Sequence, residues 1–385
     1  MGGNAFKTCT TRRMALAEYQ ALIARLSPYV STLYERTAVP QSVHNKEDFG
    51  DLDFLVAGPI ADDPPALIAE RFHSKERVRS GPVTSVEVDE FQVDLICVTL
   101  PTFDYALTFY NWNGFGMLRG VLARSLGLKD GAEGLRAPVF FSPVVDNDED
   151  YAQMMVKLRN GNLDPAKVID YNTDAGAVMG FVLLSLDHEE VLRFLDLDVE
   201  TCRRGFGTMD ELCSYFTSTK YFMPSAFSKH GGKQRIMQRL GEFLHKCVLP
   251  PGSAAFSEEN GDIRRAERSL FRKLAVRHFG KTAEWNAMVE TERIRRQYKT
   301  MFGSKVVRNI TSMSGRDLGE VMKKVKKKVP LSAPDISRTL NSLDESGVRA
   351  IIEECWHRYT AERPQTLMCE SACTRDGYNI ETAAV

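Results

Sequence analysis

Residues 46–56 read KEDFGDLDFLV, where two aspartates stand one residue apart as a glycine leads into an apolar stretch. The short apolar run 53–57, bounded by glycines on both sides, is typical of a buried strand. Side chains at positions i and i+2 of a strand lie on the same face, so Asp51 and Asp53 should project together. Two carboxylates this close repel each other unless a cation lies between them. The pair is therefore either a candidate metal site or a polar strand edge.

A third carboxylate, Asp94, lies inside QVDLICV (92–98), a stretch that otherwise has the residues of a buried strand. An unpaired carboxylate in such a strand is costly unless it is neutralised or coordinated. If this strand lies beside the one that carries Asp51 and Asp53, three carboxylates converge. Such a group holds two divalent ions about 4 Å apart in phosphoryl and nucleotidyl transfer. The alternative is that Asp94 pairs with a nearby Arg or Lys.

The composition of the 385-residue chain is that of an ordinary globular protein, with 43% apolar and 26% charged residues. The eight cysteines are scattered and form no CxxC pair, which argues against zinc and favours free thiols in a reducing compartment. No apolar run is long enough to cross a membrane, and the N-terminus lacks a secretory signal. We therefore expect an intracellular protein, nuclear or cytoplasmic, with no membrane association.

Hydrophobic periodicity predicts a small mixed α/β unit in the first third of the chain. We expect a helix over 14–37 with a break near Pro28, and a second helix over 64–72. Residues 82–99 alternate and are rich in β-branched side chains, which predicts two strands paired around a turn at Asp89-Glu90. Residues 103–127 predict mainly helix. The expected fold class is therefore α/β (α+β).

The rest of the chain is expected to be mostly helical and unevenly charged. The segment 261–330 carries 19 Lys and Arg against 7 Asp and Glu, a net charge of about +12, whereas the remainder carries about −13. We expect a mixed α/β domain at 1–145, a mostly helical region at 146–255, a basic helical region at 262–360 and a flexible tail at 361–385.

Basic residues alternate with apolar and aromatic ones in RRAERSLFRKLAVRHF (264–279) and RIRRQYKTMFGSKVVRN (293–309). Such a face suits contact with a nucleic-acid backbone, where each Lys or Arg releases condensed counterions. We expect DNA or RNA binding through 261–330; the alternative is a solvated helix face. KKVKKK (323–328) fits a nuclear signal and a helix terminus equally well. DNDED (146–150) lacks the Gly and Glu of a calcium loop and indicates an acidic linker.

The segment around the first two aspartates resembles the palm of the family X DNA polymerases, the polymerase beta group of the nucleotidyltransferase superfamily. That family has a Gly-Ser pair, a basic stretch and Gly-Asp-x-Asp before apolar residues and Pro, and PQSVHNKEDFGDLDFLVAGP (40–59) is similar without gaps. The third family aspartate stands in a motif like VDLICV. FYNWNGFGMLRGVLARSLGLKDGAEGL (109–135) is similar to the block that follows, and Arg13-Met14-Ala15 resembles the start of a family helix. The resemblance covers residues 12–138, about a third of the chain.

The resemblance implies a nucleotidyltransferase palm, with a small mixed sheet and flanking helices, that uses Mg²⁺ (or Mn²⁺) and binds a nucleoside triphosphate. Asp51 and Asp53 would hold both ions, while Asp94 would bind the catalytic ion and lie near the acceptor hydroxyl. The other implied positions surround the nucleotide: Arg13 and the amide of Gly50 at the triphosphate, Phe109 and Tyr110 by the sugar, and Asn111, Trp112 and Asn113 around the base.

The chain departs from the family pattern in the phosphate-binding loop. Pro40-Gln41 replaces the Gly-Ser pair, and Ser42 follows one place late. Proline removes an amide that glycine would offer, although the side chain of Gln41 is still able to donate to a phosphate. The phosphate-binding arginine of the family becomes His44, and Lys46 is the nearest permanent cation. These departures bear on triphosphate binding more than on metal binding.

Together these features predict transfer of a nucleoside monophosphate from an NTP or dNTP to an acceptor hydroxyl, with a nucleic-acid 3′ end as the favoured acceptor. Three alternatives stay open: a template-independent RNA or tRNA nucleotidyltransferase, a nucleic-acid-binding protein whose palm has lost catalysis, and transfer onto a protein or small molecule. The last alternative leaves the basic region without a role. Since about a dozen residues precede Arg13, the small lyase domain of several family members is not expected.

Overall fold

The computed structural model describes residues 4–140, 150–169, 178–224, 226, 238, 240–243 and 261–362. The chain divides into two compact units, Met1–Asn286 and Ala287–Val385, and the boundary falls inside a helix. The fold is mixed α/β with a mixed sheet and many helices, so the predicted class is confirmed at that level. Most of the predicted acidic linker, loop 250–262 and C-terminal tail lies outside the described residues.

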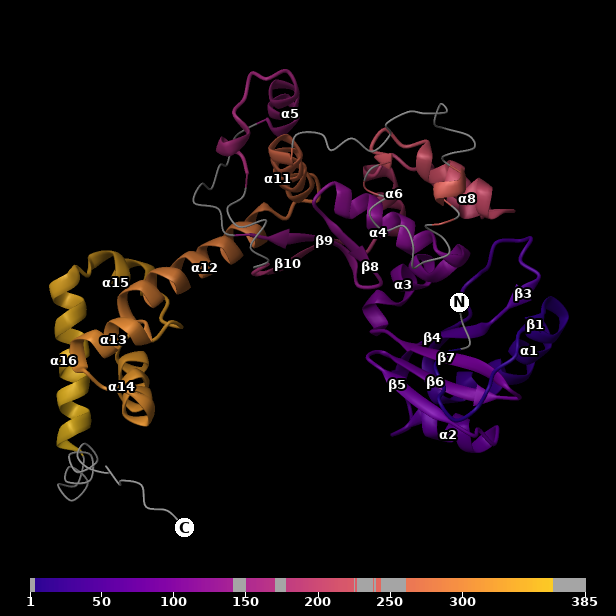
Figure 1. Cartoon of the computed structure of the whole chain (residues 1–385), viewed down its shortest axis with the longest axis horizontal. Helices are drawn as coiled ribbons and strands as arrows, with labels where there is room; N and C mark the ends of the chain where they lie inside the picture. The colour runs from indigo at the N-terminus through magenta and orange to yellow at the C-terminus, as the bar shows by residue number, and fades with distance from the viewer. Residues whose placement is uncertain are drawn as a thin grey trace, which may run out of the picture. The chain divides into compact units, whose positions relative to one another are not determined.

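Figure 1 shows the order of the elements along the chain. The strands are β1 (Met14–Ala15), β2 (Tyr34–Ala38), β3 (Asp48–Phe49), β4 (Asp51–Pro59), β5 (Arg77–Ser80), β6 (Val83–Val88), β7 (Phe91–Cys97), β8 (Lys129–Gly131), β9 (Gly134–Val139) and β10 (Gly180–Ser185). The helices of the first unit are α1 (Leu16–Leu33), α2 (Pro64–Arg71), η1 (Leu100–Thr102), α3 (Phe103–Tyr110), η2 (Asn111–Asn113), α4 (Phe115–Ser125), α5 (Tyr151–Arg159), η3 (Pro165–Lys167), α6 (His188–Phe194), α7 (Val199–Arg204), α8 (Met209–Thr217) and α11 (Gly261–His278). Then follow α12 (Thr282–Phe302), α13 (Ser304–Thr311), α14 (Gly315–Lys328), α15 (Ile336–Ser342) and α16 (Glu345–Ala361).

A five-stranded sheet with the order β2-β4-β7-β6-β5 forms the centre of the N-terminal part. Strands β4 and β7 are parallel, and the other neighbours are antiparallel. The predicted pair of strands around Asp89-Glu90 is confirmed as β6 and β7. Both turn residues have positive φ, 53° and 62°, the conformation of the tight hairpin turns that match strand twist.

The two faces of this sheet are covered by different helices. Leu52 and Phe54 of β4 are buried in a core that also contains residues of α1 and α2. Leu55 and Ala57 point to the opposite face, where they pack with Phe103 of α3. Because strand side chains alternate, β4 contributes to both cores, and the face that α3 covers is the face that carries Asp51 and Asp53.

The expected break near Pro28 is wrong, because α1 runs through this proline to Leu33. Buried Leu22, Leu26 and Val30 recur at helical spacing along the side that faces the sheet. Packing of that stripe outweighs the one hydrogen bond that proline removes. Helix α1 also ends at Leu33, four residues before the predicted end at residue 37, because residues from Tyr34 onward pair with β4 as strand β2.

A second sheet, with the order β10-β9-β8, was not predicted. No strand is predicted over residues 129–139, and β10 is an unpredicted strand within the region 146–255 that is expected to be mostly helical. In β10, Val182 and Leu184 are buried while Phe181 and Leu183 are exposed. A short apolar run of this kind does not distinguish strand from helix by its own pattern, and pairing with the distant strand β9 decides its conformation.

A buried ion pair between Arg119 of α4 and Asp130 of β8 connects helix α4 to the second sheet. Both side chains are 0% exposed. The hydroxyl of Tyr105 donates to Asp130 at 2.6 Å, and an Nη of Arg119 lies 2.7 Å from Nδ1 of His188. Removal of one partner of such a pair leaves a buried charge uncompensated, which costs about 3–5 kcal/mol. This network therefore joins α3, α4, β8 and α6 into one body.

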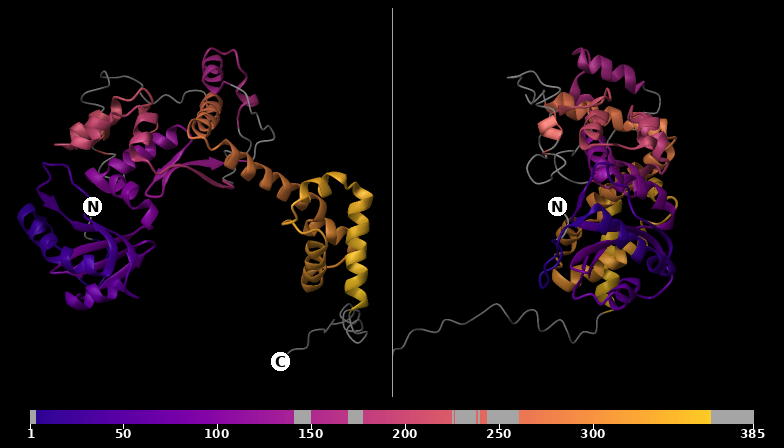
Figure 2. Two further views of the ribbon diagram at one scale, coloured as in Figure 1. Left: turned by 180° about the vertical axis from the view of Figure 1, so that it is seen from behind. Right: turned by 90° about the vertical axis from the view of Figure 1, so that its right-hand side faces the viewer.

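The basic segment 261–330 belongs to both units. Its first helix, α11, packs on α5. Ala266 and Leu270 of α11 share a buried core with Tyr151 and Leu158 of α5. In the second unit, α16 (yellow) runs beside α14 (orange), as the left view in Figure 2 shows. Helix α14 has its apolar side in the core of the second unit. Among the described helices, none combines the length and apolarity that a membrane crossing requires.

The buried histidine predicts a pH-dependent stability. Burial and then the charge of Arg119 lower the pKa of His188 from 6.5 to about 3. Between these pH values the unfolded chain binds a proton that the folded chain does not, so stability falls as the pH drops below about 6.5. We expect the stability advantage of wild type over His188→Gln to shrink by about 2 kcal/mol from pH 7.5 to pH 5. Urea unfolding at both pH values measures this, and a difference that does not change with pH would contradict it.

Candidate metal centre

The parallel register of β4 and β7 brings the three aspartates together. Asp53 pairs directly with Asp94, and Asp51 lies two residues before Asp53 on the same face. One carboxylate oxygen from each of the three lies within 4.8 Å of the others. The predicted convergence of these side chains is therefore confirmed, and the three carboxylates lie close enough to hold a metal ion.

Hydrophobic burial of the opposite strand face explains why the carboxylates point outward together. Leu52, Phe54, Val93 and Leu95 alternate with the aspartates and are at most 1% exposed. A shift of register by one residue would bring these apolar side chains out and carry the charges into the core. The acidic cluster is thus positioned by the apolar residues between its members.

The carboxylates raise the energy of one another's charges. Burial, then the charges of Asp51 and Asp94, raise the pKa of Asp53 to about 7. Burial is also the main cause that raises the pKa of Asp94. A divalent cation between these groups would compensate both the lost hydration and the repulsion. The donor set is oxygen only, which fits a hard cation such as Mg²⁺ or Mn²⁺.

Two cationic side chains lie beside the acidic cluster. The ammonium of Lys46 lies 4.4 Å from the ring centroid of Phe49. Burial lowers its pKa, while the charges of Asp51 and Asp53 oppose that shift and the charge of Arg13 adds to it. Arg13 pairs with Asp48 at 2.5 Å on the neighbouring strand β3. The charge of Lys46 thus lies within electrostatic range of Asp51, Asp53 and Arg13, and the expected contact of Arg13 with a triphosphate stays a prediction.

The loop that contains Gln41, Ser42 and His44 is held by backbone hydrogen bonds. The amide of Gln41 donates to Oδ1 of Asn111 at 2.8 Å, and the amide of Val43 donates to Oδ1 of Asn113 at 3.0 Å. The amide of His44 donates to the carbonyl of Phe206. Both asparagines thus hold the loop in this structure, and their expected contact with a base stays a prediction.

Trp112 lies between these asparagines and points into the protein. It is 5% exposed and packs against Phe206 at 5.9 Å and His44 at 6.0 Å between ring centroids. Trp112 and Asn113 have φ of 61° and 51°, a left-handed conformation that costs about 1–3 kcal/mol for each such residue. The bond from the amide of Trp112 to the carbonyl of Gln41, 2.6 Å, stabilises this turn.

The remaining predicted residues border the same region. Gly50 is buried between β3 and β4, directly before Asp51. Tyr110 lies within electrostatic range of the cluster. Burial raises the pKa of its hydroxyl, and the charge of Asp53 adds to that shift. Phe109 packs edge-on against Tyr110 and within 5.7 Å of the guanidinium of Arg119.

Gln92 was not predicted as part of the site. Its side-chain amide donates to both carboxylate oxygens of Asp94, at 3.0 and 2.9 Å, and its own Oε1 accepts from the amide of Ala5 at 2.9 Å. Ser85, the register partner of Asp94 on β6, donates to the same carboxylate. The available signal was the spacing, since Gln92 lies two residues before Asp94 and shares its strand face. Both residues fix the orientation of Asp94.

Comparison with models of known protein families and with curated protein sequences finds no match to this chain.

Substitutions at the cluster should weaken metal binding in a graded manner. Asp53→Asn should weaken Mn²⁺ binding by about a hundredfold or more, because it removes one of three charges within a few ångströms of the ion. Gln92→Leu should weaken it by about ten- to a hundredfold through loss of orientation of Asp94. Electron paramagnetic resonance of free Mn²⁺ measures both. Asp62→Asn, at an exposed aspartate outside the cluster, is the control, and an equal effect of that substitution would contradict the site.

Proposed function

We propose that the protein is a divalent-cation-dependent nucleotidyltransferase, which transfers a nucleoside monophosphate from an NTP or dNTP to an acceptor hydroxyl. The observation that carries the proposal is the approach of the Asp51, Asp53 and Asp94 carboxylates within 4.8 Å across two parallel strands. Mg²⁺ or Mn²⁺, when bound, would polarise phosphoryl oxygens and activate the attacking hydroxyl. The chain contributes three carboxylates whose spacing is set by the register of the sheet.

The cations beside the cluster support a phosphate-binding role. Lys46 is partly buried within electrostatic range of Asp51 and Asp53, and Arg13 lies close enough to influence it. Arg13 is about half exposed and its partner Asp48 is 60% exposed, so a phosphate would compete for the guanidinium at little cost. This pair supports binding of a triphosphate beside the metal centre.

The basic segment supports a nucleic acid as the acceptor. In α14, the apolar side packs into the core and the lysines lie on the other side. Lys323 pairs with Glu320 and Lys328 pairs with Glu354, and both pairs are partly exposed. Exposed ion pairs are weak, so these lysines exchange readily to phosphate. Lys326 and Lys327 are exposed, and no carboxylate partner is found for them among the described residues.

A second candidate function is nucleic-acid binding without catalysis. It is favoured by the loop at residues 40–46, where the Gln41 amide already donates to Asn111 and Pro40 offers no amide. A template-independent RNA or tRNA nucleotidyltransferase would use the same carboxylates. Transfer onto a protein or small molecule would leave the basic segment without a ligand. Activity assays with different acceptors separate these functions.

Incubation with labelled dNTPs or NTPs, Mn²⁺ or Mg²⁺, and primed DNA or single-stranded RNA tests the proposal. We expect extension of at least one acceptor, and a loss of about a thousandfold or more with Asp51→Asn, because charge stabilisation by the ions is removed. Lys46→Gln should lower kcat/KM by about ten- to a hundredfold through loss of a charge-assisted contact.

Lys157→Gln, which removes an exposed charge from α5, is the matched control for Lys46→Gln. Extension that survives Asp51→Asn would overturn the assignment of the site. Binding of nucleic acid without extension, with either ion, would instead establish the second candidate function.

Nucleic-acid binding by the basic segment should be salt-dependent. The double substitution Lys326→Gln/Lys327→Gln should reduce the slope of log Kd against log salt concentration by about 1–2, since each phosphate contact releases about one counterion. Fluorescence anisotropy at several salt concentrations measures the slope. Arg71→Gln/Arg79→Gln removes two exposed charges from the first unit, and an equal change with that variant would contradict a specific role for α14.

A further inference from the structure

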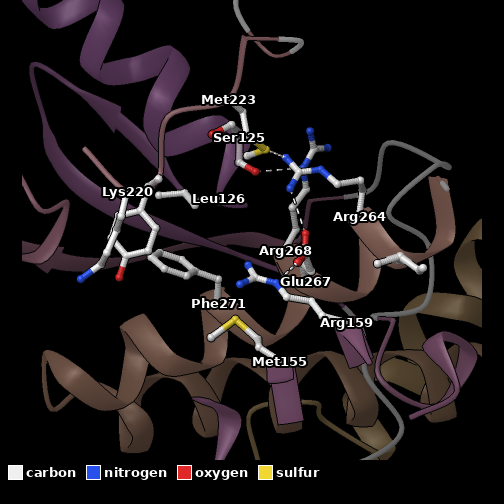
Figure 3. Close-up of a pocket in the computed structure, with 12 residues that line it drawn as sticks. Ser125, Leu126, Met155, Arg159, Lys220, Met223, Arg264, Glu267, Arg268 and Phe271 are labelled. Carbon is white, nitrogen blue, oxygen red and sulfur yellow. Dashed lines mark hydrogen bonds and ion pairs between the residues drawn. The ribbon is translucent and has the colours of Figure 1, made fainter. Parts of the chain in front are cut away.

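A cavity of about 720 Å³ in the first unit is lined by side chains from α4, α5, α11 and the segment after α8. Figure 3 shows its walls. Four of its twelve described lining residues are cationic and one is acidic; the cationic ones are Arg159, Lys220, Arg264 and Arg268. Its volume falls in the range of small-molecule sites. None of these residues takes part in the metal centre described above.

One guanidinium at the cavity, that of Arg268, has an uncharged hydrogen-bond partner. Glu267, whose side chain is 12% exposed, accepts from Arg159 at 2.6 Å and from Arg264 at 2.9 Å, and Lys220 pairs with Asp196 at 3.4 Å. Arg268 donates through Nε to the carbonyl of Ser125 at 3.3 Å, an uncharged acceptor. Burial and then the nearby charge of Arg264 lower the pKa of Arg268. A partly buried guanidinium that donates to a neutral carbonyl is stabilised by an anion that binds beside it.

Other side chains that line the cavity are apolar and aromatic. Phe271 is 4% exposed, and its ring packs edge-on against Tyr221 at 5.2 Å between centroids. Met155 and Ile263 extend this lining, and Lys220 lies 5.1 Å from the ring of Tyr221. Aromatic and thioether groups of this kind stack on planar rings. The cavity therefore combines a site for an anion with a site for a ring.

We propose that this cavity binds a nucleotide, with the phosphate at Arg159 and Arg268 and the base against Phe271 and Tyr221. A guanidinium binds phosphate oxygens through paired donors, and a base stacks on an aromatic side chain without regard to sequence. The same chemistry is present in a free mononucleotide and in the phosphorylated 5′ end of a strand. The inference goes beyond the proposed transfer reaction and does not depend on it.

Isothermal titration calorimetry of the full chain tests the inference. The protein carries Asp51→Asn and the buffer contains no divalent ion, so the metal centre makes no contribution. The ligands are adenosine monophosphate, adenosine, inorganic phosphate, and a short oligonucleotide with either a 5′-phosphate or a 5′-hydroxyl. Adenosine monophosphate or the 5′-phosphorylated strand should bind at least about tenfold more tightly than its counterpart without phosphate. If adenosine monophosphate binds more tightly than the 5′-phosphorylated strand, the ligand is a free mononucleotide. If the strand binds more tightly, the ligand is a 5′ end.

Variants assign the binding to the cavity. Arg268→Gln and Arg159→Gln should each weaken binding by about tenfold or more, and Arg159 is 65% exposed, so its replacement leaves the fold intact. Glu267→Gln should strengthen binding, because it removes the carboxylate that competes with phosphate, and misfolding does not produce such a gain. Arg79→Gln is the matched control.

Three results would overturn the inference: no binding by any of these ligands, equal binding of inorganic phosphate and adenosine monophosphate, or equal effects of Arg159→Gln and Arg79→Gln. Each leaves the proposed transfer reaction untouched, because that reaction is measured with intact Asp51 and with metal. Conversely, if the protein binds the nucleotide in the cavity but extends no acceptor, only the proposed transfer reaction at the metal centre is contradicted.

Discussion

The parallel pairing of β4 with β7 is the constraint on which the metal centre depends. Its register sets Asp53 beside Asp94, and the pleat of the strand puts Asp51 on the same face. The register itself is held by the apolar face of the same strands, where Leu52 and Phe54 lie in the core. The free energy that brings three negative charges together therefore comes from hydrophobic burial on the other side of the sheet.

Contacts between distant segments complete the surroundings of the centre. Asn111 and Asn113 hold the backbone of residues 41–43, and the carbonyls of Phe206 and Gly207 accept from the amides that follow. This arrangement depends on the left-handed conformation of the turn after α3, which is unfavourable by itself. This turn lies between α3 and α4, and the buried network of Tyr105, Arg119 and Asp130 connects both helices to the second sheet. The loop beside the carboxylates is thus fixed by elements far away in the chain.

Like charges are gathered at two places in the first unit. Three carboxylates meet at the metal centre, and at the cavity beside α11 the guanidiniums of Arg159 and Arg264 share the carboxylate of Glu267. Repulsion of this kind destabilises the folded protein, and a bound ion or phosphate relieves it. Both places therefore store electrostatic energy that a ligand of opposite charge would recover, and this is the physical reason for assigning ligands to them.

Much of the centre was accessible from the sequence. The spacing of Asp51 and Asp53 before an apolar run, and the single carboxylate in QVDLICV, each predicted a strand with an outward charge, since the period of two is a local property. The hairpin at Asp89-Glu90 was local in the same sense. The local pattern was ambiguous at β10 and did not identify this strand, and the expected break at Pro28 in α1 was wrong because packing opposed a local rule.

Only the tertiary structure decided which side chains support the carboxylates and where the arginines meet. Ser85 donates to Asp94 because β6 lies beside β7, and no local pattern specifies that neighbour relation, whereas Gln92 reaches Asp94 along β7 itself. The cationic cavity likewise draws on residues more than a hundred positions apart, such as Arg159 and Glu267. The sequence by itself determined the residue types and their strand faces, because these follow from local periodicity. Their meeting points follow from long-range packing, which only the folded chain defines.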